Sequence, residues 1–172
     1  MQAAVRVKAQ SSRVRWGARL VGAGLTTTAA LGIAAGPALA QAGPPSDAGV
    51  QPTEVADNPP VSCPTGATGF RVDNPTTGPV SIPGDGTFGL TVSNSSQGQV
   101  FSFTIPASDH RAAVKVTAKG GNAANVYTYD STTGFPNGIA ADGSLHAPIN
   151  PSGKFADLSH IDFCVIPTNY PG

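Results

Sequence analysis

The chain is poor in aromatic, charged and sulfur-containing residues. Tryptophan and methionine occur once each, and aromatic residues make up 6% of the 172 residues, so a few phenylalanines must fill most of any core. No stretch after residue 40 carries an apolar stripe at the 3.6-residue period of a helix, which argues against a helical bundle. Glutamate occurs once, at Glu54, so a glycosidase-type pair of carboxylates would need two aspartates.

The familiar patterns of nucleophilic catalysis are missing as well. The chain has no G-x-S-x-G motif, so a hydrolase would lack its usual strand–turn–helix context. Neighbouring residues of a strand point to opposite faces, so we expect that Ser159 does not use His160 as a base. His160 and Asp162 do share a face. They form either a base with its orienting carboxylate or an exposed hydrogen-bonded pair.

The first 40 residues combine positive charge with an apolar run. Residues 1–19 contain five basic residues and no acid, and residues 20–35 are uncharged and rich in Ala, Gly, Leu and Thr. Ala38-Leu39-Ala40 then places small residues at both positions that signal peptidase reads. This order predicts a secretory signal peptide, residues 1–40. A membrane anchor is the alternative, but the run of about 16 residues is short of the ~20 that a spanning helix needs.

Cleavage after Ala40 would leave an acidic protein. The whole chain has ten basic and ten acidic residues, and five of the basic ones lie in residues 1–40. The remainder lacks the excess of positive charge that nucleic acid or an anionic membrane surface requires. We therefore expect secretion to the extracellular space, no nucleic-acid partner and no membrane insertion. A cell-surface glycan and another protein are both open as partners.

The two cysteines, Cys63 and Cys164, lie near opposite ends of the exported part. An even cysteine count in an exported chain predicts a disulfide, and two cysteines allow one pairing. A zinc site is the alternative, but C-x-x-C spacing is missing. In a strand, Cys164 shares a face with His160 and Asp162. The bridge should therefore lie on the more polar face and tie the N-terminal segment across it.

Short runs of alternating apolar and polar residues fill residues 61–172. Phe, Leu, Ile and Val recur at every second position, and Gly, Pro, Asn and Ser separate the runs. The runs lie at residues 69–72, 80–82, 87–93, 101–105, 114–118, 126–129 and 161–165. This pattern predicts an all-β domain, an antiparallel β-sandwich of jelly-roll or immunoglobulin-like type with about seven or eight short strands. Residues 108–113 could add one helical turn.

Residues 41–60 differ from the rest of the exported part. They contain five prolines, few bulky apolar residues and no periodicity. This composition predicts a flexible Pro-rich linker ahead of the domain, or alternatively a frayed terminus.

Two groups of residues could bind a ligand. Asn125, Tyr127 and Tyr129 alternate with Val126 and Thr128, so their side chains share one face of a strand. The two rings could stack on a sugar, or these residues could lie at the boundary of the core. Asp130, Asp142 and Asp157, with further Asp and Asn residues nearby, could supply some of the six to eight oxygens that calcium needs. The alternative is that they form turns. No other cofactor is indicated.

The C-terminal passage also carries a recognisable pattern. It runs from Lys119-Gly120-Gly121 through Tyr127-Thr128-Tyr129 and an L-x-A-P-x-N-x-x-G-K loop to L-S-H-I-D-F-C at residues 158–164. This pattern, covering about fifty residues, resembles a family of secreted bacterial β-domains that have no assigned activity. The resemblance implies a non-catalytic extracellular or cell-surface module. A carbohydrate-binding domain and a small secreted hydrolase are the alternatives.

Overall fold

Alternation of apolar and polar residues produces strands at each of the predicted runs. The computed structural model describes residues 42–84 and 86–168, so the predicted signal peptide lies outside the described residues. The strands are β1 (Thr53–Ala56), β2 (Thr68–Asp73), β3 (Gly78–Ser81), β4 (Thr87–Ser95), β5 (Gly98–Thr104), β6 (Arg111–Gly120), β7 (Ala123–Thr128), β8 (Ala141–Leu145) and β9 (His160–Pro167). The described residues include no helix long and apolar enough to cross a membrane.

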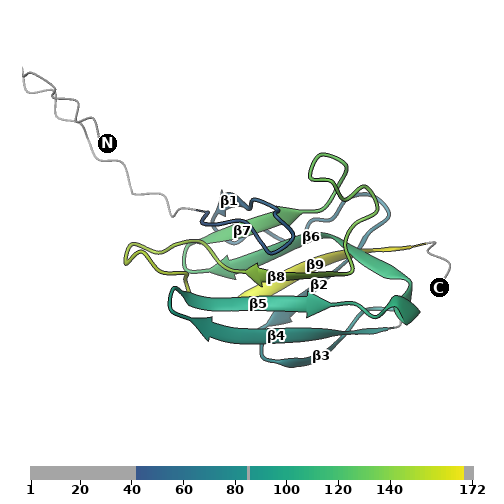
Figure 1. The fold of residues 1–172 in the computed structure, drawn as a ribbon, viewed down its shortest axis with the longest axis horizontal. Coiled ribbons are helices and arrows are strands. Elements are labelled where there is room, and N and C mark those ends of the chain that lie inside the picture. The colour runs from purple at the N-terminus through teal and green to yellow at the C-terminus, as the bar shows by residue number, and fades with distance from the viewer. Residues whose placement is uncertain (1–41, 85, 169–172) are drawn as a thin grey trace, which may run out of the picture. The chain divides into compact units, whose positions relative to one another are not determined.

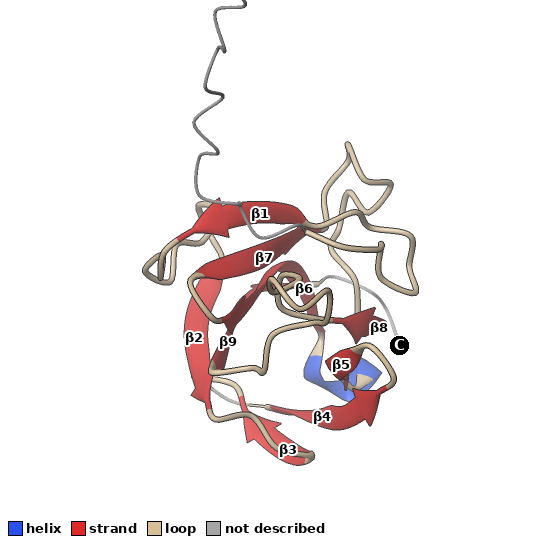
Figure 2. Ribbon diagram, turned by 90° about the vertical axis from the view of Figure 1, so that its left-hand side faces the viewer, coloured by secondary structure: helices blue, strands red, loops and turns tan. Residues whose placement is uncertain are grey.

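The strands form two antiparallel sheets. One sheet has the order β1-β7-β6-β9-β2 and the other the order β3-β4-β5-β8. The sheets face each other across a shared core (Figure 1). In Figure 2, where the strands are seen nearly end-on, β1, β7, β9 and β2 curve around the top and left, and β3, β4, β5 and β8 lie along the bottom and right. The predicted all-β antiparallel sandwich is therefore confirmed, with nine strands among the described residues.

The β4–β5 hairpin shows how the alternation sets the register. Leu90 pairs with Phe103 and Val92 with Phe101, so the apolar side chains of both strands point to the same face. Phe88 and Leu90 are buried, whereas Thr87, Gly89 and Thr91 are exposed. A slip of one residue would expose the apolar set, which is why this pattern specifies one register.

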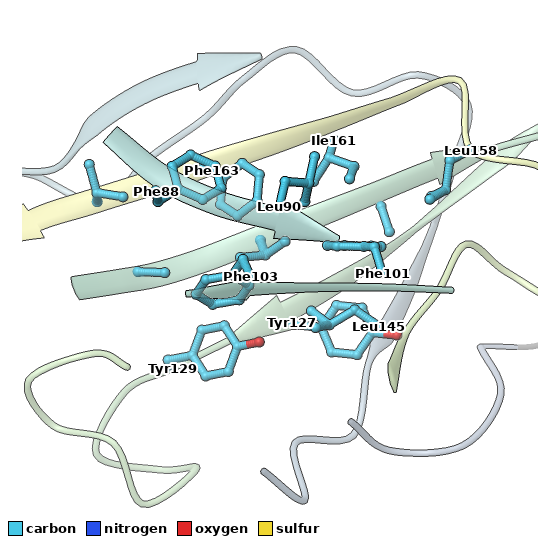
Figure 3. Packing of buried hydrophobic residues seen from close by; sticks show 14 of the residues in the cluster. Phe88, Leu90, Phe101, Phe103, Tyr127, Tyr129, Leu145, Leu158, Ile161 and Phe163 are labelled. Carbon is cyan, nitrogen blue, oxygen red and sulfur yellow. The ribbon is translucent and has the colours of Figure 1, made fainter. Parts of the chain in front are cut away.

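Aromatic rings fill the centre of the core, as the scarcity of other large residues predicts. The ring centre of Phe163 lies 4.8 Å from Phe88, 5.5 Å from Phe103 and 5.6 Å from Phe70. Figure 3 shows the rings of Phe88, Phe103 and Phe163 between the sheets, with Tyr127 and Tyr129 close by. One ring of β9 therefore joins β2 of its own sheet to β4 and β5 of the other.

Residues 42–60 belong to the domain, which corrects the expectation of a flexible linker. The segment 53–56 is β1, which pairs with β7 at the edge of the larger sheet. Val50 is 2% exposed and lies in the core. Ser46 closes a turn by donating its N–H to the carbonyl of Val50 at 3.0 Å. A four-residue strand beside a turn is too short to show periodicity, so composition alone misclassified the segment.

The helical turn expected at residues 108–113 is smaller and earlier. A 3-10 turn covers Ala107–Asp109, and β6 begins at Arg111. His110 ends the turn in the left-handed region, with φ 47°. The chain thus turns sharply between the two sheets without a longer helix.

Replacing Phe163 with alanine should lower the free energy of unfolding by about 3–5 kcal/mol, because the cavity would remove ring contacts to both sheets. Thr91→Ala, on the exposed face of β4, should change it by less than about 0.5 kcal/mol. Urea unfolding followed by far-ultraviolet circular dichroism measures both. Equal midpoints for the two variants would contradict the central place of Phe163.

Candidate functional site

The side chains of the expected sugar platform point into the core. Asn125, Tyr127 and Tyr129 are 0%, 0% and 1% exposed. They come from β7 and the residue just after it, and their face meets the smaller sheet and the β8–β9 loop. Their rings are therefore unavailable for stacking on a sugar, which corrects the platform and favours the alternative that these are core residues.

Each tyrosine hydroxyl on this face has a buried partner. The Tyr129 hydroxyl donates to Asp142 Oδ2 at 2.7 Å. The Tyr127 hydroxyl donates to the carbonyl of His146 at 3.2 Å and accepts from the His146 N–H at 3.1 Å. Burial raises the pKa of both tyrosines above the usual range. The hydroxyls thus fix the residues around β8 against β7.

The N-terminal segment completes this network. Asn125 Nδ2 donates to the carbonyl oxygens of Ala42 and His146, at 2.7 and 3.0 Å. Asp142 Oδ1 accepts the N–H of Ala48 at 2.9 Å. Because both partners on β7 and β8 are buried, these bonds hold residues 42–48 on the body of the domain. We call this set, Asn125, Tyr129, Asp142 and His146, the cradle.

His146 is the cradle residue that the sequence analysis did not find. Its ring is fully buried and stacks on Phe155, with ring centres 3.8 Å apart and planes 9° apart. Its Nε2 lies 3.2 Å from the carbonyl of Pro44. Gly43 passes so close that a Cβ there would lie 2.6 Å from His146 Cε1. In the sequence, the only local signal near this contact is Gly43 followed by two prolines.

The three aspartates proposed for calcium do not share one environment. Asp130 accepts from the Thr132 N–H and hydroxyl in an exposed turn, and these bonds lower its pKa. Asp142 belongs to the cradle, and Asp157 is exposed. Among residues 42–84 and 86–168, no three His, Cys, Asp or Glu side chains come together to hold a metal. Asp130 therefore has a turn role and Asp142 a core role, and the three aspartates named for calcium are not grouped in the part of the chain that the structure describes.

The disulfide lies where the strand alternation predicts. Cys63 and Cys164 are bridged, with Cα atoms 5.5 Å apart, on the outer face of the larger sheet. His160 and Asp162 share this face. The Lys115 ammonium donates to the carbonyl of Ser62 at 2.8 Å. Residues 59–63 thus run across the polar face, which confirms the expected position of the bridge.

An ion pair lies beside the bridge. The Arg71 guanidinium donates to both carboxylate oxygens of Asp162, at 2.6 and 2.9 Å. The bidentate hydrogen bond is the main cause that raises the pKa of Arg71. Asp162 is 4% exposed, so leaving it unpaired would be costly. The carboxylate is thereby committed to Arg71 and not to orienting His160.

His160 is buried on the same face without a complete set of partners. The residue is 7% exposed, and its Nε2 has no hydrogen-bond partner among the described residues. Its Nδ1 lies 3.4 Å from the Ser159 hydroxyl, a contact that strand alternation alone did not predict because Ser159 stands just before β9. Burial, and then the Arg71 charge, lower the pKa of His160.

An open pocket lies between the β3–β4 turn and the start of β6. It measures about 340 Å³ and is lined by Gly84, Gly86, Ser108, Asp109 and Arg111. Asp109 Oδ2 accepts the N–H of Thr87 at 2.9 Å, which holds the carboxylate at the pocket wall. One hydroxyl, one carboxylate and one guanidinium can hydrogen-bond a small polar molecule. No local pattern in the sequence marks these five residues as a site.

Comparison of the chain with protein-family models, with curated proteins and with solved structures finds no match. The resemblance to secreted bacterial β-domains therefore stays a prediction.

Removing the disulfide should destabilise the domain strongly. The bridge closes a separation of 101 residues, and a loop of this size removes denatured-state entropy worth roughly 4–5 kcal/mol in the chain-entropy model. Cys63→Ala, Cys164→Ala and the double variant should lose similar amounts, since each removes the same bond. Urea unfolding measures the losses. Single variants as stable as wild type would show that the bridge contributes nothing.

The stability of the domain should fall as the pH drops below about 6.5, the ordinary pKa of histidine. The pKa of His160 is lower in the folded protein than in the unfolded chain. As the pH falls, the unfolded chain therefore binds a proton before the folded protein does, and acid favours unfolding. Unfolding midpoints between pH 7.5 and pH 5 should therefore change less in His160→Gln than in wild type. Ser159→Ala keeps the imidazole and should keep the wild-type slope. An unchanged slope in His160→Gln would refute this assignment.

Proposed function

We propose that the protein is an exported, non-catalytic extracellular or cell-surface β-module of bacterial origin. The observation that carries the proposal is the Cys63–Cys164 bridge, which joins the segment between β1 and β2 to the last strand, β9. Disulfides form and persist in oxidising compartments outside the cytosol, so the bridge supports export. The order of charge, apolar run and Ala38-Leu39-Ala40 in the sequence supports the same route.

Two observations support a module over the alternatives of carbohydrate binding and hydrolysis. The three residues that could have stacked on a sugar are buried and hydrogen-bonded within the fold. Asp162, the carboxylate that could have oriented His160 as a base, is held by Arg71. The polar residues with the strongest claim to chemistry therefore hold the domain together.

Export can be tested on the full chain in a secreting bacterial host. Protein in the medium should begin at Gln41 and contain no thiol that alkylates without reductant. A variant with Ala38→Leu and Ala40→Leu should remain unprocessed, because signal peptidase requires small residues at these positions. Wild-type protein that begins at Met1 and stays in the membrane fraction, or secreted protein with two alkylatable thiols, would overturn the proposal.

A further inference from the structure

The first fifteen described residues form an arm that docks on the rest of the domain. The arm, residues 42–56, makes its contacts with the body at three places. Its start meets the cradle through Ala42 and Pro44, its middle meets β8 and the core, and its end is β1 on the edge of β7. In the middle, the Asp47 N–H donates to the carbonyl of Gly143 at 2.9 Å. The arm thus binds the rest of the domain, here called the body, as a separate peptide would, although both belong to the same chain.

The docking site is built for this particular sequence. Gly43 has φ 93° and no room for a Cβ beside His146, so glycine is required there. Val50 is buried in the core, and β1 pairs with β7 over four consecutive residues. Without the arm, the body would expose the edge of β7 and leave Asn125 and Asp142 short of partners. If the arm leaves its own body, the same segment of a second copy of the chain can take its place, because it has the same glycine, the same apolar side chain and the same strand.

The arm is joined to the body by a strained, proline-containing hinge. Asp57 follows β1 in the left-handed region, with φ 64°, where a residue other than glycine is strained. Pro59 and Pro60 come next, and they restrict the hinge to extended conformations. The arm lies outside the covalent loop that Cys63 and Cys164 close, so it can leave the body with the bridge intact. Short hinges under strain favour exchange between copies.

We propose that two copies of the chain exchange their arms, each arm docking on the cradle and β7 edge of the other copy. Every contact that the arm makes in the closed monomer is made again across the dimer. Only residues 57–60 change conformation, at the cost of hinge contacts such as the Asp57 N–H bond to the carbonyl of Asn122. In the closed monomer the hinge tethers the arm to its own body, which favours the monomer over the dimer. For a short flexible link, the effective concentration of a tethered segment is on the order of millimolar. The dimer should therefore appear when the protein folds at high concentration, and not when it folds at high dilution.

A disulfide lock separates arm exchange from other association. Val55 of β1 pairs with Ala124 of β7, so Val55→Cys with Ala124→Cys can be oxidised in the dilute folded monomer to fix the arm on its own body. Ser93→Cys with Val100→Cys, a pair within the β4–β5 hairpin, is the matched control because it does not cross the hinge. All proteins are unfolded in denaturant with their disulfides intact, refolded at micromolar and near-millimolar concentration, and sized by light scattering.

Wild type and the Ser93/Val100 control should form dimers after concentrated refolding, and these dimers should persist on dilution because separation requires both arms to undock. The Val55/Ala124 lock should remain monomeric at every concentration. A locked protein that dimerises as much as wild type would overturn the proposal, and so would wild type that remains monomeric throughout. If the locked variant fails to fold, the single variants Val55→Cys and Ala124→Cys are mixed, refolded together at near-millimolar concentration and oxidised. A disulfide-linked heterodimer shows that the arm of one copy lies on β7 of the other, and its absence would overturn the proposal.

Discussion

Hydrogen bonds to polar atoms on the inner face of β7 hold the arm and the residues around β8 on the rest of the domain. Asn125, Tyr127 and Tyr129 carry amide and hydroxyl groups into an apolar core, and each group left unpaired would cost about 1–3 kcal/mol. The sheets can supply few partners, because their backbone groups are already used in the ladders. The two hydroxyls and the Asn125 NH2 group find their partners instead in Asp142, the backbone at His146 and the arm, whereas Asn125 Oδ1 has none among the described residues. The carbonyls of Ala42 and Pro44 lie within hydrogen-bond distance of buried Asn125 and His146, and these contacts help to order the arm.

The outer face of the same sheet is stabilised differently. There the chain between β1 and β2 covers the strands, and its backbone carbonyls accept from Lys115 and Arg71. Asp162 pairs with Arg71, and the bridge fixes the covering segment at one end. His160 is also buried on this face, where the Arg71 charge helps to lower its pKa. One strand, β9, thus carries a core ring on one side and buried charge on the other.

The sequence predicted the parts that local periodicity determines. Phe88 with Leu90 and Phe101 with Phe103 mark their strands because one face of each is apolar, and two cysteines leave one possible pairing. The short strands β1 and β8 were missed, because T-E-V-A and A-D-G-S-L contain too few apolar residues to show a period. Alternation placed Tyr127 and Tyr129 on one face, but whether that face met solvent depended on residues 42–48 and on the loop around His146. Such contacts between distant segments leave no local pattern.

The position of the bridge also determines how the domain would respond to mechanical load. Once the arm has left β7, tension applied between the two ends of the chain would pass through the Cys63–Cys164 bridge, so the chain between the two cysteines would not be extended. Only the arm and its hinge lie in the path on the N-terminal side. The arm would peel from β7 first, and further extension would stop at the bridge. A module pulled between two anchors would thus lengthen by a fixed, short amount, because the strands between the two cysteines are not pulled apart.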